Sequence, residues 1–392
     1  MNKLKSVDQE TIKILNQKKI INLLYRNKQL TKQEISQELN ISIPTVINNI
    51  NELIERGIVD DAGVAESTGG RKPTIIRFLP NSRYSFGVCI TKDKVRIILT
   101  NLNFNIIEER AFDMPEEVQD FRSLILKIKD EIEDILSVYK IPFDKILGIG
   151  FSLPGTIDEE KLFLKNMTNF KVKNIYFKEF EKNFKMPIFI ENEANASAYA
   201  ESFINFKGYK NNLVFISITE GIGAGIIINN NVYKGINKRA GEIGHMTVVK
   251  NGRRCNCGKK GCWEVYASKK ALLNEYKKEF GVKNKSLNDF LDMTKDNLKA
   301  KEILDNYVGF LAEGIKNIIL IFDPQNIIIG GEVFSYKDLI EEDLINKVFE
   351  DNSLYDKNEC NVMFSSLGGN AAIFGAALLP MESVFFLTGN VI

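Results

Sequence analysis

The chain has 392 residues, more than one hydrophobic core usually serves, so we expect two or three domains. Its 44% hydrophobic and 26% charged residues are typical of a globular protein, and a formal net charge of +1 excludes a generally basic, polyanion-coating protein. No apolar stretch approaches the ~20 residues of a membrane helix, and the N-terminus lacks the apolar core of a signal peptide. The sequence therefore predicts a cytoplasmic protein without a membrane partner.

The first eighty residues are modestly basic, with twelve Lys and Arg against nine Asp and Glu. Apolar residues at helical spacing predict a first helix that ends near Tyr25. A second helix is predicted over 31–40, where Thr31 and Glu34 form a capping-box pattern. A third follows over 45–57, with inward apolar residues at Val46, Ile47, Ile50, Leu53 and Ile54. Two short helices joined by a tight turn indicate a helix-turn-helix.

A basic loop lies between two short strands after this helix pair. Residues 58–63 and 74–78 predict a hairpin, and its loop carries Arg71 and Lys72, which can reach DNA phosphates. The outward face of the third helix is predicted to present Ser42, Thr45, Asn48 and Asn49 to the bases. We expect a winged helix-turn-helix DNA-binding domain over residues 1–80. The alternative is a small helical packing or dimerisation domain.

The rest of the chain alternates between strand and helix patterns. Strands are predicted within 85–112, 146–158, 187–190, 212–235 and 326–331, and helices over 121–139 and in the Ala-rich tail. Glycines mark several strand ends, which is typical of ligand-binding α/β lobes. We expect lobes over 81–190 and 191–392, with packing of the last helix back onto the first lobe left open.

Three of the five cysteines stand within eight residues. Cys255, Cys257 and Cys262 lie on a loop with Gly258 and Gly261, and the single histidine of the chain, His245, stands just before it. Three thiolates and one imidazole form a closed tetrahedral zinc shell, so we expect a structural zinc ion. The alternatives are redox-active thiols or a chance grouping.

Two carboxylates flank the end of a predicted strand in the stretch IENEANA. Glu191 and Glu193 surround Asn192, and a run of small residues typical of a helix follows. Each carboxylate is a candidate for a catalytic base, a ligand contact or a helix N-terminal charge. For Glu191 we favour a background charge.

Longer motifs resemble those of a known family. The stretch GIGAGIIINNNVYKGINKRAGEIGH, followed by CNCGKKGCWE, resembles the signature of the ROK family (repressors, open reading frames and sugar kinases), and the resemblance extends over essentially the whole chain. It implies a two-lobed, actin-like sugar-kinase fold with the sugar bound between the lobes. Family members with an N-terminal winged helix are typically sugar-responsive repressors, and those without one are usually kinases.

The resemblance also implies a set of sugar-binding positions. Glu242 and His245 of the GEIGH motif, Glu264 after the last zinc cysteine, and the pair Asn192 and Glu193 correspond to sugar contacts. Gly155 and Asn166 correspond to positions that line the pocket. Carboxylates suit this role because they form charge-assisted hydrogen bonds with sugar hydroxyl groups.

Kinase motifs of the family are incomplete here. The phosphate loop after the first strand lacks its aspartate and paired glycines at Cys89, Ile90 and Thr91, and Glu193 stands where the kinases keep an aspartate base. Gly330 and Gly331, where the kinases contact adenosine, are retained. The sequence thus predicts a non-enzymatic repressor. The alternatives are an ATP-dependent sugar kinase with an added DNA-binding domain, and a purely structural zinc protein.

ENEANA and the GGRKP wing most resemble the xylose-repressor branch of the NagC/XylR-type regulators. We therefore expect xylose as the effector, with glucose or another hexose second. The expected partners are operator DNA and a second copy of the chain in a homodimer, with a tetramer left open. Sugar binding is expected to shift the population of lobe closures and so alter operator affinity.

Overall fold

The computed structural model describes residues 9–64, 73–114, 121–167, 170, 172–206, 212–282, 286–350 and 354–385. The chain divides into two compact units: Met1–Glu191 together with Ala376–Ile392, and Asn192–Gly375. None of the helices in the described ranges combines the length and the apolar character that crossing a membrane requires.

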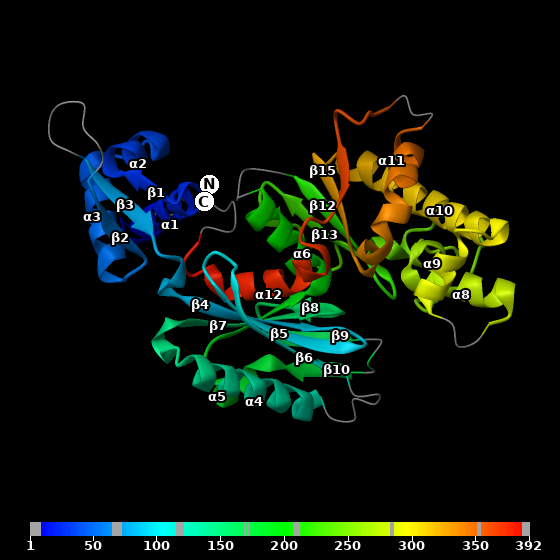
Figure 1. Ribbon diagram of the computed structural model, residues 1–392, viewed down its shortest axis with the longest axis horizontal. Coiled ribbons are helices and arrows are strands. Elements are labelled where there is room, and N and C mark those ends of the chain that lie inside the picture. The colour runs from blue at the N-terminus through cyan, green and yellow to red at the C-terminus, as the bar shows by residue number, and fades with distance from the viewer. Residues whose placement is uncertain are drawn as a thin grey trace, which may run out of the picture. The chain divides into compact units, whose positions relative to one another are not determined.

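The N-terminal part of the first unit consists of three helices and a small antiparallel sheet (Figure 1). The elements in chain order are α1 (Gln9–Asn27), β1 (Gln29–Thr31), α2 (Lys32–Leu39), α3 (Ile43–Glu55), β2 (Val59–Val64) and β3 (Thr74–Phe78). The strand order is β1-β3-β2, so β2 and β3 form the predicted hairpin and β1 adds an edge strand that the sequence does not predict. This arrangement is a winged helix-turn-helix.

Local signals determine where the two short helices begin and end. The Thr31 hydroxyl accepts a hydrogen bond from the Glu34 N–H at 3.2 Å, and the Glu34 carboxylate accepts one from the Thr31 N–H at 2.7 Å. The predicted capping box is therefore confirmed. α2 ends at Asn40, whose backbone is left-handed (φ 53°), and Ser42 caps the start of α3. Because both ends are set locally, the turn between the helices stays short.

The larger part of the first unit is built on a five-stranded sheet of order β11-β7-β4-β5-β6. Its strands are β4 (Tyr84–Ile90), β5 (Lys94–Asn101), β6 (Ile106–Asp113), β7 (Ile146–Leu153) and β11 (Ile188–Asn192). β4 pairs antiparallel with β5 and parallel with β7. The remaining elements are α4 (Phe121–Tyr139), α5 (Glu181–Phe184) and a smaller sheet of order β10-β9-β8, with β8 (Thr156–Asp158), β9 (Phe163–Met167) and β10 (Val172–Tyr176).

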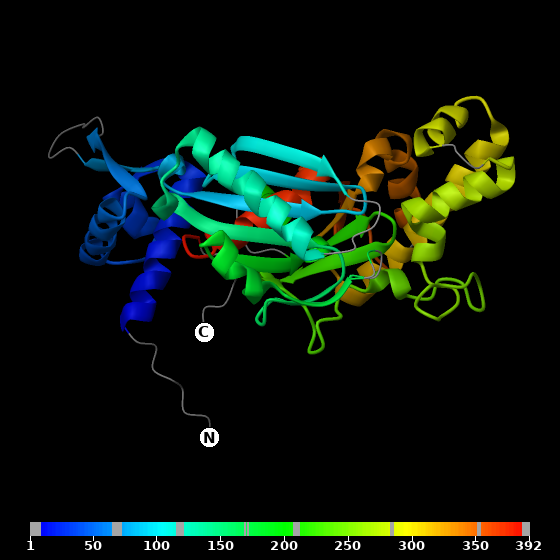
Figure 2. The ribbon, with the colours of Figure 1, turned by 90° about the horizontal axis from the view of Figure 1, so that it is seen from below.

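The two faces of this sheet carry different side chains. Phe86, Val88 and Phe151 pack on one face in a core that includes the buried residues of α4. Figure 2 shows the helix α4 lying across the sheet. The other face carries small side chains. A Cβ atom at Gly150 would lie 1.9 Å from the carbonyl oxygen of Ala376. The Ser85 hydroxyl donates a hydrogen bond to the carbonyl of Ala377 at 2.6 Å. The C-terminal half of α12 (Ala371–Met381) therefore packs on this face at backbone distance.

The second unit contains a mixed sheet of order β14-β13-β12-β15-β16. Its strands are β12 (Leu213–Ile218), β13 (Ile222–Ile228), β14 (Asn231–Val232), β15 (Asn326–Gly331) and β16 (Asn361–Phe364). The helices are α6 (Glu193–Ala200), which continues as a π-helical turn over Glu201–Asn205, α7 (Glu264–Ala267), α8 (Lys269–Phe280), α9 (Leu287–Met293), α10 (Leu298–Phe322), α11 (Glu341–Phe349) and the first residues of α12.

Alternate side chains of β12 enter cores on the two sides of this sheet. Val214 and Ile216 join the buried face of α10, whereas Phe215 packs with Ala198 of α6. The second unit is therefore an α/β/α sandwich, with α6 on one face of the sheet and α10 on the other (Figure 1). The predicted α/β class is confirmed in both units.

Candidate functional site

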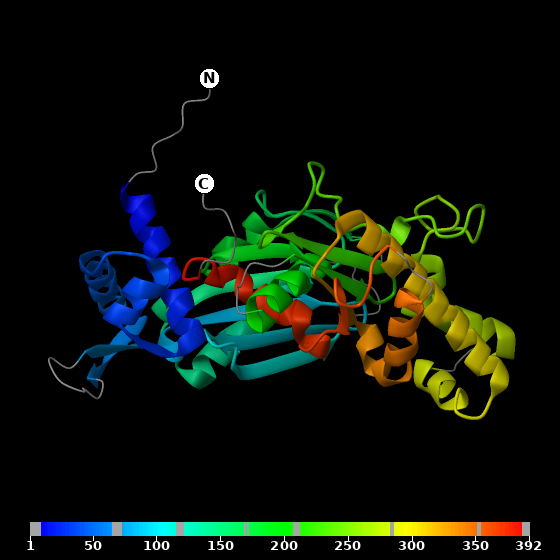
Figure 3. The same cartoon turned by 90° about the horizontal axis from the view of Figure 1, so that it is seen from above.

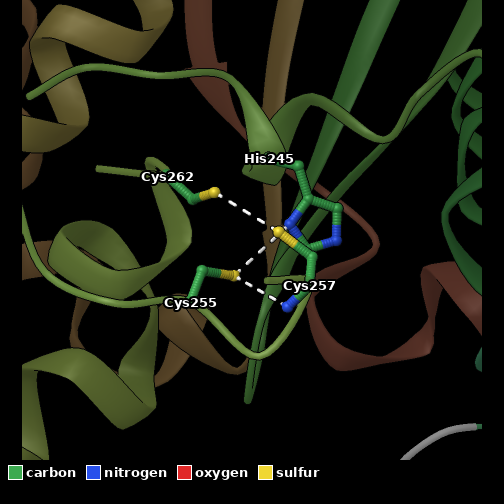
Figure 4. Close-up of side chains that lie close together, drawn as sticks. All are labelled: His245, Cys255, Cys257 and Cys262. Carbon is green, nitrogen blue, oxygen red and sulfur yellow. Dashed lines mark hydrogen bonds between the residues drawn. The ribbon is translucent and has the colours of Figure 1, made fainter. Parts of the chain in front are cut away.

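The predicted zinc residues come together at one point of the second unit. The Sγ of Cys255 lies 3.6 Å from Nδ1 of His245, and the Sγ atoms of Cys257 and Cys262 lie 3.6 Å apart. The four potential ligand atoms all lie within 4.8 Å of one another. Figure 4 shows the four side chains directed toward one another. The sequence thus identified the members of this cluster correctly.

These distances fit a tetrahedral metal shell. Zinc–sulfur bonds of ~2.3 Å place the sulfur atoms of such a shell about 3.8 Å apart. Gly258 and Gly261 have left-handed backbones (φ 93° and 81°), and an isolated bridge joins Arg254 to Lys260, so the loop folds back on itself as a short hairpin. The Cys3His cluster can therefore hold a metal ion, and its closed donor set suits a structural role.

The three thiols differ in how easily they ionise. Burial raises the pKa of the Cys255 and Cys262 thiols, whereas the backbone N–H of Lys259 lowers the pKa of Cys257. A metal ion must therefore displace protons from at least two buried thiols, and its binding is expected to depend on pH.

The histidine of the cluster lies between two of the predicted sugar contacts. Its Nδ1 lies 3.4 Å from a carboxylate oxygen of Glu264, on the side of the sulfur atoms, and its Nε2 lies 3.9 Å from a carboxylate oxygen of Glu242. The Cys255 thiol also donates to Glu264 at 3.0 Å. A metal ion bound through Nδ1 would leave the remaining ring proton on Nε2, the nitrogen nearer to Glu242. The structure therefore brings Glu242, His245 and Glu264 together.

Trp263, between the last cysteine and Glu264, anchors this region to α10. Its indole Nε1 donates to the carbonyl of Phe310 at 2.6 Å, and the ring is fully buried. A Cβ atom at Gly314 of α10 would lie 1.9 Å from the indole. Sequence reasoning missed this contact, since nothing in the local pattern predicts which helix the indole meets. As the single tryptophan of the chain, it is a natural fluorescent reporter of the cluster.

Asn192 and Glu193 stand at the beginning of α6. The Asn192 side-chain oxygen accepts hydrogen bonds from the N–H groups of Ala194 and Asn195, at 2.9 and 3.3 Å, and so caps the helix. The Glu193 carboxylate accepts from the hydroxyl of Ser217, which lies 3.0 Å from both of its oxygens. Asn192 thus has a structural task that its position in the sequence does not reveal.

Glu193 has an unusual charge environment. Burial raises the pKa of its carboxyl to about 7, the Ser217 hydroxyl opposes the shift, and the negative charge of Glu332 adds to it. Glu332 follows β15 directly and forms an ion pair with Lys269. Near neutral pH, the Glu193 carboxyl is therefore protonated in some molecules, where it can donate a hydrogen bond, and ionised in others, where it only accepts.

The structure contradicts the expectation for Glu191, the other carboxylate of IENEANA. Glu191 was expected to be a background charge, yet it is only 3% exposed and lies within β11. Strand β11 continues past Ile190 through the two polar residues that seemed to end it, so Glu191 is held in the interior instead of in solvent.

The Gly-rich turn between β12 and β13 lies beside both groups of candidate residues. A Cβ atom at Gly221 would lie 2.9 Å from a carboxylate oxygen of Glu264, and one at Gly223 would lie 3.8 Å from the side chain of Ala194, next to Glu193. At Gly225 a Cβ atom would lie 2.3 Å from the carbonyl of Ala194. Gly223 and Gly225 therefore let α6 approach the sheet closely.

Two further predicted pocket residues lie together in the first unit. Asn166 pairs with Thr156 across β8 and β9, and a Cβ atom at Gly155 would lie 2.1 Å from the Asn166 carbonyl. Gly155 also has a left-handed backbone (φ 124°), so only glycine fits this position without strain.

The predicted DNA contacts on α3 are arranged differently from the expectation. Asn48 is exposed as predicted. Ser42 and Thr45 lie within 2.8 Å of each other through their hydroxyl groups. Asn49, expected to face outward, is 4% exposed and donates to the carbonyl of Thr45 at 2.7 Å. A short polar side chain on the inner edge of a helix bonds to the preceding turn, and this removes Asn49 from the outer surface.

The apolar face of α3 is also narrower than predicted. Val46, Ile50 and Leu53 are fully buried, but Ile47 and Ile54, expected inward, are 36% and 37% exposed. Within the described residues, α1, α2 and β2 are the elements that pack most closely on this helix, and they cover a stripe and not half of its circumference.

The basic tip of the wing, with Arg71 and Lys72, lies outside the described residues. The strands that carry it are described, and their pairing is reinforced by an ion pair between Arg77 and Asp60 at 2.5 Å.

Comparisons with known proteins agree with this architecture. The model of the ROK family matches residues 85–382, and a model described as winged helix-turn-helix DNA-binding matches residues 15–60. A xylose repressor of Bacillus spizizenii is 32% identical over 381 residues, covering 96% of this chain and 97% of its own. The Escherichia coli K12 regulator NagC, described as a DNA-binding transcriptional dual regulator, is 27% identical over 336 residues, covering 83% of this chain and 82% of its own.

Solved structures give the same fold. A ROK family transcriptional regulator described as a homologue of the E. coli MLC protein has a TM-score of 0.82 at 23% identity, covering 95% of this chain and 97% of its own. A ROK family glucokinase from Streptomyces griseus, solved with glucose and AMPPNP, has a TM-score of 0.63 at 23% identity and covers 76% of this chain and 99% of its own. The two-lobed sugar-kinase fold preceded by a winged helix is thereby established.

Proposed function

The chain belongs to the ROK family, and from that premise we propose that it is a sugar-responsive transcriptional repressor. A winged helix binds operator DNA, and a sugar held by the ROK domain changes the affinity for that DNA. The observation that carries the proposal is the match along the whole chain, winged helix included, to a xylose repressor. Such a protein acts beside the DNA in the cytoplasm, and two-fold symmetric operators favour a homodimer.

For the sugar we propose contacts with Glu242, His245, Glu264, Asn192 and Glu193. The grouping of the first three residues supports this assignment, because two carboxylates and one ring N–H can accept from and donate to neighbouring hydroxyl groups. Gly155 and Asn166 remain predicted pocket positions.

Xylose is the effector we propose, and glucose or another hexose is the second choice. The relatives named xylose repressors support this, and so does Glu193, whose extra methylene can fill the space that a hexose CH₂OH group needs. Titration calorimetry with both sugars tests the assignment: xylose should bind more tightly, and Glu193→Asp should shift the preference toward glucose. Much tighter binding of glucose by the unchanged protein would refute it.

For the Cys3His cluster we propose a structural zinc ion. His245, Cys255, Cys257 and Cys262 would hold it, and it would fix the histidine ring and the loop that ends at Glu264. Support comes from the short distances among the ligand atoms and from the closed donor set. The zinc ion supplies no open coordination position for activating water.

A sugar kinase is the second candidate, and one observation favours it. Burial raises the pKa of Glu193 to about 7, close to the value that a general base requires at neutral pH. The residues at the phosphate position argue against it, because the phosphate loop is changed at Cys89, Ile90 and Thr91. A coupled assay that detects ADP, with ATP and either xylose or glucose as substrates, distinguishes the two functions. Sugar-dependent release of ADP would identify a kinase, and no release is expected of a repressor.

A further inference from the structure

In the proposed function, α3 is the helix that lies in the major groove of DNA. It exposes aliphatic side chains in the part that contacts the bases. Ile43 and Ile47 are 46% and 36% exposed and stand one turn apart on the outer side of α3. They belong to the N-terminal half of the helix, which is the part of a recognition helix that contacts base edges in the major groove. Neither is needed for the core, which α3 supplies through Val46, Ile50 and Leu53.

Polar groups at the start of α3 are largely engaged within the protein. The Ser42 and Thr45 hydroxyl groups bond to each other, and the Asn49 amide is buried against the Thr45 carbonyl. Asn48 and Asn51 are also exposed. Ile43, Ile47, Asn48 and Asn51 are thus exposed on this helix and available to contact bases.

The helix α3 carries no arginine or lysine, the residues that most often contact guanine. No Lys or Arg stands between Ile43 and Glu55, so α3 itself cannot form the bidentate contact to guanine O6 and N7. Arg56, just beyond, donates from its guanidinium to the side chain of Gln17 at 3.0 Å. Adenine suits an amide side chain, and the 5-methyl group of thymine suits an aliphatic one.

We propose that α3 reads A·T base pairs, with the thymine 5-methyl groups contacted by Ile43 and Ile47. This inference rests on the proposed function and adds to it the base pairs that each copy of α3 recognises. Specificity then depends on apolar contact with methyl groups as well as on hydrogen bonds from Asn48 and Asn51.

The probe is duplex DNA selected from a random-sequence library with the purified full-length protein. In the selected duplex, each thymine is replaced in turn by deoxyuridine, which removes the methyl group and leaves base pairing unchanged. Removal of a contacted methyl group should weaken binding about fourfold, from ~0.8 kcal/mol per buried carbon. For the variants Ile43→Ala and Ile47→Ala, the same replacement should leave the affinity for DNA unchanged at the position that the missing side chain would contact.

Ile54→Ala is the matched control, because Ile54 is 37% exposed at the far end of the same helix. It should keep the full difference between thymine and deoxyuridine. Equal affinity of the unchanged protein for both bases at every position would overturn the proposal, as would full discrimination by both alanine variants. If no duplex is selected at all, the DNA-binding function itself fails, and that result is distinct from binding without methyl dependence.

Discussion

The ring of Phe385 lies 5.3 Å from the ring of Tyr25 in an edge-on contact, although the two residues stand near opposite ends of the chain. Figure 3 shows the red segment that follows α12 beside α1, in blue. Phe78 of β3 lies 6.1 Å from each of them, and Lys18 donates to the carbonyl of Glu382 at 2.5 Å. The segment that follows α12 is thus built into the core of the winged helix. Burial in this cluster raises the pKa of Tyr25 to about 12.

This relationship predicts that Phe385→Ala destabilises the first unit. Removing a fully buried phenylalanine from a core costs about 3–5 kcal/mol in the free energy of unfolding. Urea unfolding followed by circular dichroism should show a lower midpoint for this variant. Phe143→Ala, at a 47% exposed phenylalanine, should leave the midpoint nearly unchanged, and equal midpoints for both variants would contradict the role of the cluster.

The metal cluster predicts that Cys257→Ser and Cys262→Ser lose bound zinc. Each variant removes one of four ligands, so purified protein should contain well below one zinc per chain by elemental analysis. The unfolding temperature should fall, and a chelator should shift the emission of Trp263 in the unchanged protein. Cys89→Ala changes a buried cysteine outside the cluster and should retain the metal. Retention of full zinc content by both serine variants would show that the assigned ligands are wrong.

The raised pKa of Glu193 predicts a specific dependence of stability on pH. Its pKa is about 7 in the folded protein and near 4.5 in the unfolded chain, so between these values only the unfolded chain loses the proton. The stability that the neutral form contributes is complete below pH ~4.5, falls as pH rises toward 7, and is absent above it.

Glu193→Gln removes this titration. The free energy of unfolding of the unchanged protein, minus that of the variant, should decrease by roughly 3 kcal/mol between pH 4.5 and 7. Taking the difference cancels other groups that titrate in the same range. A difference that stays constant with pH would mean that Glu193 is solvated in the folded protein.

The grouping around His245 predicts that Glu242→Gln weakens sugar binding without loss of metal. Glu242 lies toward Nε2, away from the sulfur atoms, so its removal should leave the metal shell intact. Loss of a charge-assisted hydrogen bond of about 1.5–3 kcal/mol corresponds to roughly 10- to 150-fold weaker binding of xylose in calorimetry. Glu313→Gln, at an exposed carboxylate of α10, is the control and should bind as before. Unchanged affinity of Glu242→Gln would remove this residue from the sugar site.

Much of this architecture follows from local signals in the sequence. The capping box at Thr31 and Glu34 and the φ-positive glycines of the metal loop depend on a few neighbouring residues, so their pattern suffices. The members of the Cys3His cluster were identifiable because the chemistry of zinc restricts the residue types that can hold it.

Features that depend on tertiary packing were less predictable. Asn49 is buried and Ile47 is exposed, the reverse of the prediction, because α1, α2 and β2 cover a narrow stripe of α3. Glu191 is buried because β11 extends beyond its apolar run. The contacts of Trp263 with α10 and of Phe385 with Tyr25 join segments far apart in the chain, and no local pattern specifies them.

The central claim is that sugar binding and operator binding are coupled, so that each changes the affinity of the protein for the other. The most direct measurement is calorimetric titration of xylose into the protein alone and into its complex with selected operator duplex. Linkage requires that the affinity of xylose for the complex differ from its affinity for the protein alone by the same factor by which xylose changes DNA binding, and a factor of about 5–150 is expected. Identical xylose affinities with and without operator would contradict the account.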